Sequence, residues 1–236
     1  MPKLMKKYIS ETIENALKGT KVPKHWIDFI IEPTSSVTVK FPLERENGKI
    51  ETIVGLRVIH SNHQLPSKGG LRFSKVTTQE VLETLASLMT YKSALLDIPF
   101  KGARGCIFID PDKYSLAEKT HITRRFTIEM WKRSMISSST GIVNPDLGTN
   151  SRTMNIIKDT YKSLNINNNV DIDNVVVGKG INFGGLQTYP ISYGLGVATA
   201  VSYITENITD NKNVPLFTGY DMRNSKKSVI IHGFGK

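Results

Sequence analysis

The chain has 236 residues, of which 39% are hydrophobic and 8% aromatic, a composition that supports a sizeable buried core and excludes a disordered tail. The formal net charge of +10 permits RNA, phosphorylated ligands, anionic lipid or acidic proteins as partners and selects none of them. A single cysteine, Cys106, excludes an internal disulfide, and no apolar run is long enough to predict a transmembrane segment. The N-terminal stretch contains Glu11 and Glu14 and no Arg, so no targeting presequence is predicted from it.

Hydrophobic periodicity in the first half predicts helices on either side of a β-hairpin. Asn47-Gly48 is a dipeptide that suits a tight hairpin turn, and Thr77 with Glu80 has the spacing of a helix-capping box. The predicted elements are a helix over 4–17, strands over 37–41 and 51–59, and a helix from 77 to about 96.

The second half continues the alternation of strands and helices. Ser115 and Glu118 form a second capping-box pattern. The predicted elements are a strand over 106–109, a helix from 115 to about 135, a loop over 144–150, a helix to about 164, an exposed connection over 165–169, a helix over 190–204 and a strand over 226–231. This alternation indicates an α/β layered architecture.

Several short segments could carry chemistry, each with a simpler structural interpretation. Lys68, in the turn Pro66–Arg72 predicted to join a strand to a helix, could seat an anion, although an isolated Lys-Gly-Gly is more often a solvated turn. Lys92 is by itself a surface lysine, and Asp146 is either a turn aspartate or a catalytic proton shuttle. Gly233-Phe234-Gly235 could open a phosphate-binding turn.

Metal and thiol chemistry are the less favoured interpretations. His60 and His63 lie three residues apart, but spacing places no third ligand, so the expected metal site is none. Cys106 lies among apolar residues, which favours packing over nucleophilic catalysis.

Taken together, these segments resemble the glutamate dehydrogenase family (Glu/Leu/Phe/Val dehydrogenases), especially its eukaryotic mitochondrial type. The similarity runs in order through most of the chain. The segments that carry it are Lys68-Gly69-Gly70-Leu71-Arg72-Phe73, Leu85–Ala94, Asp97-Ile98-Pro99-Phe100, Thr123–Thr127, Pro145-Asp146-Leu147-Gly148-Thr149 and Asp159-Thr160-Tyr161.

The resemblance implies a fold and a set of residue roles. It implies a three-layer α/β substrate domain with a mixed sheet over residues 1–189, and a linking helix and first strand of an incomplete Rossmann-like dinucleotide domain over 190–236. It also implies that Lys68 and Lys92 bind the two carboxylates of the substrate and that Asp146 takes part in proton transfer. Gly233 and Gly235 are the corresponding cofactor-binding residues.

The chain departs from the family at its catalytic lysine, a position that Arg104 occupies. A lysine can lose its proton when buried, whereas a guanidinium stays protonated in proteins. Lys101 also replaces a family glycine, and Tyr189, Tyr193 and Leu195 replace polar residues near the cofactor. These losses, with a cofactor domain reduced to its first strand, favour a catalytically impaired protein.

Two functions from different classes follow. The leading hypothesis is a non-catalytic accessory subunit of a larger mitochondrial assembly, such as a mitoribosome or respiratory complex, with protein or RNA partners and no cofactor. The alternative is an active glutamate dehydrogenase that uses NAD or NADP, of which this chain is a truncated part. A sensor that binds a dicarboxylate through Lys68 and Lys92 is a third possibility. The family further implies the mitochondrial matrix and a homo-oligomer.

Overall fold

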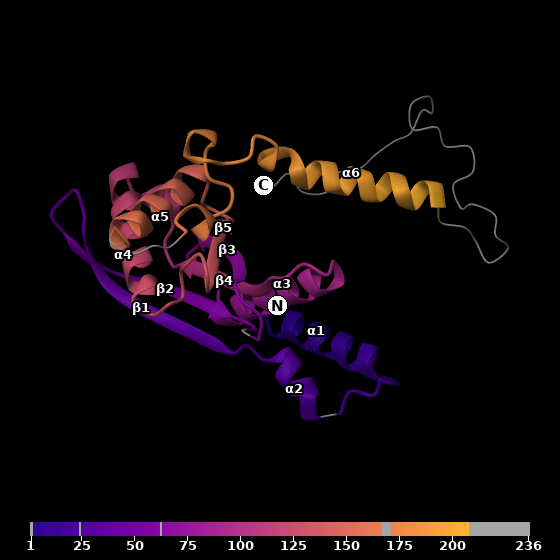
Figure 1. Cartoon of the computed structure of the whole chain (residues 1–236). Helices are drawn as coiled ribbons and strands as arrows, with labels where there is room; N and C mark the ends of the chain where they lie inside the picture. The colour runs from indigo at the N-terminus through magenta and orange to yellow at the C-terminus, as the bar shows by residue number, and fades with distance from the viewer. Residues whose placement is uncertain (1, 24, 62, 167–170, 208–236) are drawn as a thin grey trace. The chain divides into compact units, whose positions relative to one another are not determined.

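The structure, a computed structural model, describes residues 2–23, 25–61, 63–166 and 171–207 (Figure 1). The chain divides into two compact units, Met1–Gly185 and Leu186–Lys236. The helices are α1 (Pro2–Leu17), α2 (His25–Ile31), α3 (Gln79–Leu95), α4 (Leu116–Trp131), α5 (Ser151–Leu164) and α6 (Tyr189–Asn207). The strands are β1 (Ser35–Glu44), β2 (Ile50–Ile59), β3 (Ser67–Phe73), β4 (Lys101–Ile107) and β5 (Gly141–Pro145).

The first unit is built on a five-stranded mixed sheet with the order β1-β2-β4-β3-β5. The long hairpin of β1 and β2 is antiparallel, and β2 is also antiparallel to β4. By contrast, β3 runs parallel to both β4 and β5. The residues that follow β3, β4 and β5 therefore emerge at the same edge of the sheet.

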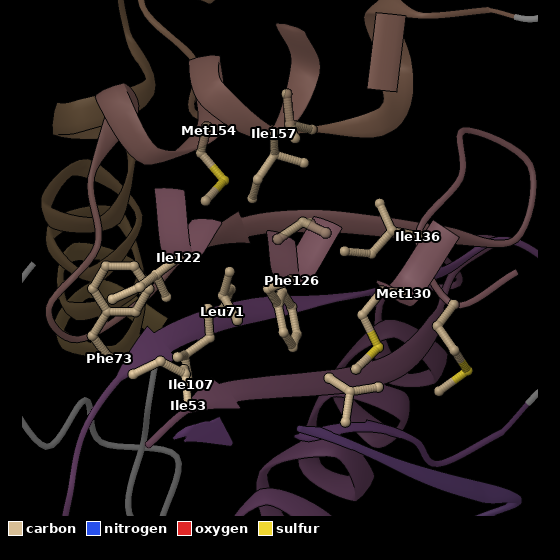
Figure 2. Close-up of a cluster of buried hydrophobic side chains, with 14 of the residues drawn as sticks. Ile53, Leu71, Phe73, Ile107, Ile122, Phe126, Met130, Ile136, Met154 and Ile157 are labelled. Carbon is tan, nitrogen blue, oxygen red and sulfur yellow. The ribbon is translucent and has the colours of Figure 1, made fainter. Parts of the chain in front are cut away.

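Helices cover both faces of this sheet. On one face, α4 and α5 pack over the main core, which includes Leu71, Phe126 and Ile157 (Figure 2). On the other face, α3 packs against β2 and β4 through a smaller cluster that includes Leu82 and Cys106. Figure 1 shows α3 on the opposite side of β3, β4 and β5 from α4 and α5. The predicted three-layer α/β fold with a mixed sheet is therefore confirmed.

Local sequence signals located most elements correctly. The hairpin turn forms at Asn47-Gly48, where Gly48 has a φ of +77° that suits a residue without a side chain. The capping box of Ser115 and Glu118 is present at the start of α4. The first capping box is displaced by one residue, since Thr78 and not Thr77 caps α3 and accepts from Val81 N.

Four expectations about local structure are wrong. The strand predicted over 106–109 begins five residues earlier and runs from Lys101 to Ile107 as β4. The segment Lys68–Arg72 is not a turn but lies within β3, because its glycines allow close packing of neighbouring strands and not a reversal of the chain. The predicted loop 144–150 begins as the end of β5, and the helix expected to reach Met135 ends at Trp131. The short helix α2 was not predicted.

The predicted strand 226–231 and the glycines Gly233 and Gly235 lie outside the described residues, as does most of the connection 165–169. The second unit is described through α6, which covers the helix predicted over 190–204. None of the helices within the described ranges combines the length and apolarity needed to cross a bilayer.

Candidate functional site

Two predicted site residues, Lys68 and Arg104, lie on the face of the sheet that α3 covers. Side chains alternate between faces along a strand, so Leu71 and Phe73 enter the main core while Lys68 and Arg72 point to the other face. On the neighbouring strand, Arg104 shares that face with Cys106, which packs beneath α3. The parallel pairing of β3 with β4 brings these basic side chains together.

Asp146 follows β5 directly and meets two of these basic side chains. Its Oδ2 lies 2.7 Å from Arg72 Nε and 2.5 Å from Arg104 Nη2. Burial of the carboxyl opposes ionisation, but the hydrogen bond from Arg72 and the charges of Arg104 and Arg72 outweigh it, so the pKa of Asp146 lies below its usual value. Asp146 is therefore an ionised carboxylate whose charge is shared between two guanidinium groups.

The turn that carries Asp146 is docked against the end of β3. Thr149 Oγ1 accepts a hydrogen bond from Asp146 N at 2.9 Å and donates to Leu71 O at 2.8 Å. A Cβ added to Gly70 would lie 2.9 Å from Asp146 Cβ and 3.3 Å from Arg104 Cζ. Only a glycine at position 70 leaves room for this ion pair to cross β3.

Lys68 and Lys92 supply two further positive charges. Burial, and then the nearby charge of Lys92, lowers the pKa of Lys68. In the part of the chain that the structure describes, neither ammonium has a carboxylate within ion-pair distance. Two neighbouring lysines without a counter-ion, one of them mostly buried, form a site suited to an anion.

Close packing of α3 on β4 fixes the position of the helix that carries Lys92. A Cβ on Gly102 would lie only 1.9 Å from Ala86 O, so the helix approaches the strand more closely than any larger residue would allow. Gly102 N also donates a hydrogen bond to Thr90 Oγ1 at 2.8 Å, two residues before Lys92 on the same helix.

Lys101, the other basic residue of β4, lies away from this site. It occupies the first position of the strand, opposite Ser67, and three residues along the strand place it on the face opposite to Arg104. It is 8% exposed and forms no ion pair with Asp146. Lys101 therefore lies outside the group of side chains that contains Arg104 and Asp146.

The remaining candidates are engaged elsewhere. The ring nitrogens of His60 contact Thr90 Oγ1 and Ile31 O, whereas His63 is exposed beside Ser61. No group of three His, Cys, Asp or Glu suited to a metal ion occurs among the residues with a described position. Burial raises the pKa of Cys106 to about 12, which disfavours the reactive thiolate.

In the second unit, Tyr189 and Tyr193 interact with each other on α6. Their hydroxyl oxygens lie 3.0 Å apart and their rings meet edge to face. Leu195 is exposed on the same helix.

The sequence places Arg72 near Lys68 as part of a possible anion site, but it does not predict the contact of Arg72 with Asp146 or a role for Thr149. Arg72 stands in the segment that the sequence predicts as a turn, and its contact with Asp146 spans 74 residues of sequence. Arg72 follows Gly70 by two residues and Lys68 by four. Because alternate residues of a strand point to the same face, this spacing indicates that Arg72 and Lys68 share a face if the segment is a strand.

The comparisons with known proteins agree on one family. A family model described as the Glu/Leu/Phe/Val dehydrogenase dimerisation domain matches residues 33–163. The mitochondrial glutamate dehydrogenase of Dictyostelium discoideum is 41% identical over 203 residues, which are 85% of this chain and 39% of that protein. A probable glutamate dehydrogenase of Sinorhizobium fredii is 34% identical over 216 residues, covering 91% of this chain and 46% of the relative.

Solved structures give the same result. The hetero-hexameric glutamate dehydrogenase of Thermus thermophilus, in a leucine-bound form, matches with a TM-score of 0.79 and 33% identity over 87% of this chain and 48% of that one. Glutamate dehydrogenase from Peptoniphilus asaccharolyticus matches with a TM-score of 0.79 and 27% identity over 86% and 50%. The chain thus spans about half the length, or less, of these relatives. Because the family match covers more than half of the chain and contains Lys68, Lys92, Arg104 and Asp146, this chain belongs to the Glu/Leu/Phe/Val dehydrogenase family.

Proposed function

We propose that this chain is the substrate-binding part of a glutamate dehydrogenase, which interconverts glutamate with 2-oxoglutarate and ammonium. The observation that carries the proposal is the neighbouring pair Lys68 and Lys92, which has no carboxylate partner among the described residues, on the side of the sheet where Asp146 meets Arg72 and Arg104. A dicarboxylate substrate supplies the missing negative charges.

The dehydrogenase hypothesis now replaces the leading expectation of a structural subunit. The four relatives described above are all named as glutamate dehydrogenases. Nothing in the structure or the comparisons supports an accessory role, an RNA partner or a ribosomal or respiratory assembly. The departures at Arg104 and on α6 remain, and they affect how well the chemistry proceeds.

In this proposal Lys68 and Lys92 hold the substrate carboxylates, and Asp146 is the residue that exchanges protons with the substrate nitrogen. Arg104 stabilises the ionised form of Asp146 and cannot act as a base, because its guanidinium does not lose its proton. A carboxylate held between two arginines is a weak base, so proton transfer is slower than it is with a lysine at position 104.

The cofactor follows from the relatives. Two proteins of Halobacterium salinarum that are similar to this chain are named as an NAD-specific and an NADP-specific glutamate dehydrogenase. We therefore propose NAD or NADP as the cofactor, and the choice between them stays open. The bound cofactor would accept or donate hydride. Gly233 and Gly235, the proposed contacts of its phosphates, lie outside the described residues.

The proposal extends to organisation and assembly. Residues 1–189 form the substrate and dimerisation domain, and residues 190–236 lead into the dinucleotide-binding domain. Self-association follows from the matched dimerisation domain and from the relative that is named as a hexamer. The mitochondrial matrix is proposed because the relative from Dictyostelium discoideum is mitochondrial.

The test is an assay of reductive amination with the full-length product of the gene, using 2-oxoglutarate, ammonium and NADH or NADPH. We expect measurable turnover, a loss of about 10²–10⁴-fold in kcat for Asp146→Asn, and a gain of about tenfold or more for Arg104→Lys. Lys101→Met is the matched control, since it removes a lysine of the same strand on the opposite face, and its kcat should equal that of the parent protein. Absence of turnover in both the parent and Arg104→Lys would refute the proposal.

A further inference from the structure

The candidate site carries an excess of fixed positive charge. Two cations, Arg72 and Arg104, contact one carboxylate, that of Asp146, and Lys68 shares the sheet face of these arginines with the charge of Lys92 nearby. The side chains of Arg72, Arg104 and Asp146 are 10%, 18% and 14% exposed, so water screens their charges only in part. The positive charges on this side of the sheet therefore favour a ligand that is itself negatively charged.

Asp146 is poorly placed to receive a third cation. Arg72 and Arg104 converge on the same oxygen, Oδ2, and so already share its negative charge. A neutral lysine at position 104 would leave that charge available to a ligand ammonium. The guanidinium of Arg104 cannot become neutral in this way, so it presents a permanent positive charge beside the carboxylate.

The two forms of the proposed substrate differ in charge at the atom that reacts. Glutamate carries an ammonium group on its α-carbon at neutral pH, whereas 2-oxoglutarate carries an uncharged carbonyl oxygen and has one more net negative charge. The carbonyl oxygen can accept a hydrogen bond from a guanidinium, which has five N–H donors and no acceptor. The ammonium group has only donors and is repelled by the same group.

We propose that Arg104 makes this site select dianionic 2-oxo acids over the corresponding amino acids. The inference deepens the proposed function and rests on it for the identity of the ligand. It assigns Arg104 a role in specificity: the residue favours the oxo acid by hydrogen bonding and disfavours the amino acid by charge.

The test is calorimetric titration of the full chain with three probes at pH 7.5: 2-oxoglutarate, L-glutamate and glutarate. Glutarate has the two carboxylates and neither the oxo group nor the amine. We expect 2-oxoglutarate to bind at least about tenfold more tightly than glutamate, with glutarate also tighter than glutamate. Equal affinities for 2-oxoglutarate and glutamate would overturn the inference, as would the absence of binding by either.

Variants separate a role in specificity from a role in folding. Arg104→Met should reduce the ratio of the two affinities by about tenfold, chiefly by improving the relative binding of glutamate. Lys101→Met removes one positive charge from the same strand and should leave the ratio unchanged. Circular dichroism verifies that both variants are folded, and a folded Arg104→Met protein that weakens all three probes equally would contradict the inference.

The two proposals fail in different ways. If the full-length protein turns over substrate but binds glutamate and 2-oxoglutarate equally, the inference about Arg104 is wrong and the proposed function is supported. Selective binding of 2-oxoglutarate without turnover, even in Arg104→Lys, supports the selectivity of the site and removes the dehydrogenase function.

Discussion

At the scale of single residues, exchange of one cation for another changes what the site can do. Lysine and arginine have the same charge, but only lysine can be neutral at a pH where proteins function. At position 104 the guanidinium joins Asp146 in an ion pair and strengthens the ionised form of that carboxyl. Under the two proposals made above, an arginine in place of the family lysine therefore alters both proton transfer and ligand selection.

His60 is a second residue whose protonation is constrained by its surroundings. Its Nε2 faces Ile31 O at 3.1 Å and must donate, so in the neutral ring Nδ1 accepts from the Thr90 hydroxyl at 2.9 Å. Burial lowers the pKa of His60, against the smaller opposing effects of the Ile31 carbonyl and of Glu32. The charge of His63 lowers it slightly further.

We predict that His60 makes the protein less stable in mild acid. Its pKa is lower in the folded state, so the unfolded chain binds its proton first as pH falls through about 6.5, and the free energy of unfolding falls with it. The contribution of one such group is at most about 1.4 kcal/mol per pH unit. Urea unfolding between pH 7.5 and 5.5 should show a smaller slope for His60→Gln than for the parent.

His63→Gln is the control, because His63 is exposed and its charge is the smallest of the effects on the pKa of His60, so its loss should change the slope only slightly. A parental slope in His60→Gln would show that other groups cause the dependence on pH.

At the scale of elements, a small number of side-chain caps fix where helices start. Ser115 Oγ accepts from Glu118 N at 3.2 Å, and Glu118 Oε2 accepts from Ser115 N at 2.9 Å. Glu118 Oε1 also accepts from Arg45 Nε at 2.7 Å, which ties the end of the β1–β2 hairpin to the first turn of α4. This cap therefore joins a local signal to a tertiary contact.

We expect Ser115→Ala to lower the free energy of unfolding by about 1 kcal/mol, because it leaves an amide at the start of α4 without its acceptor. Leu116→Ala, at an exposed neighbouring position, should change the stability by less than about 0.5 kcal/mol. Urea unfolding of the two variants measures the difference. Equal stabilities would mean that water replaces the Ser115 hydroxyl at no cost.

At the scale of the whole first unit, Arg57 joins three segments within the main core. It is fully buried on β2, donates from Nε to Met135 O at 2.9 Å and from Nη2 to Ile142 O at 3.1 Å. Burial lowers its pKa to about 10. The guanidinium thus connects β2 with β5 and with the segment after α4. In the sequence, an arginine between Leu56 and Val58 in an otherwise apolar strand indicates a buried polar contact of this kind.

We predict that Arg57→Ala lowers the free energy of unfolding by about 2–5 kcal/mol, since it leaves a cavity and two buried carbonyls without donors. Arg57→Lys should be intermediate, because a lysine can reach one carbonyl but lacks the fork that reaches both. Denaturant unfolding monitored by circular dichroism checks the order of the three proteins. A fully stable Arg57→Ala protein would show that the three segments hold together without this connection.

The sequence by itself determined the helices other than α2, the hairpin and the capped start of α4, because these depend on residues a few positions apart. Periodicity placed α3 and α5 within a few residues, and Asn47-Gly48 placed the hairpin turn. The resemblance of short motifs to one family identified the family as well. Each of these signals is local or a direct match of letters.

Only the tertiary structure decided what the chemistry-bearing residues touch. The two glycines after Lys68 suggested a turn, yet a Cβ on Gly69 would lie 1.6 Å from Ala103 O, so they serve the close pairing of β3 with β4. Parallel strands need long crossover connections, so partners such as Arg72 and Asp146 lie far apart in sequence and no local pattern records their contact. The same sheet places Arg104 beside Asp146 and Lys101 on the other face. Side chains alternate between the two faces along β4, and the pairing of β4 with β3 decides which side chains meet.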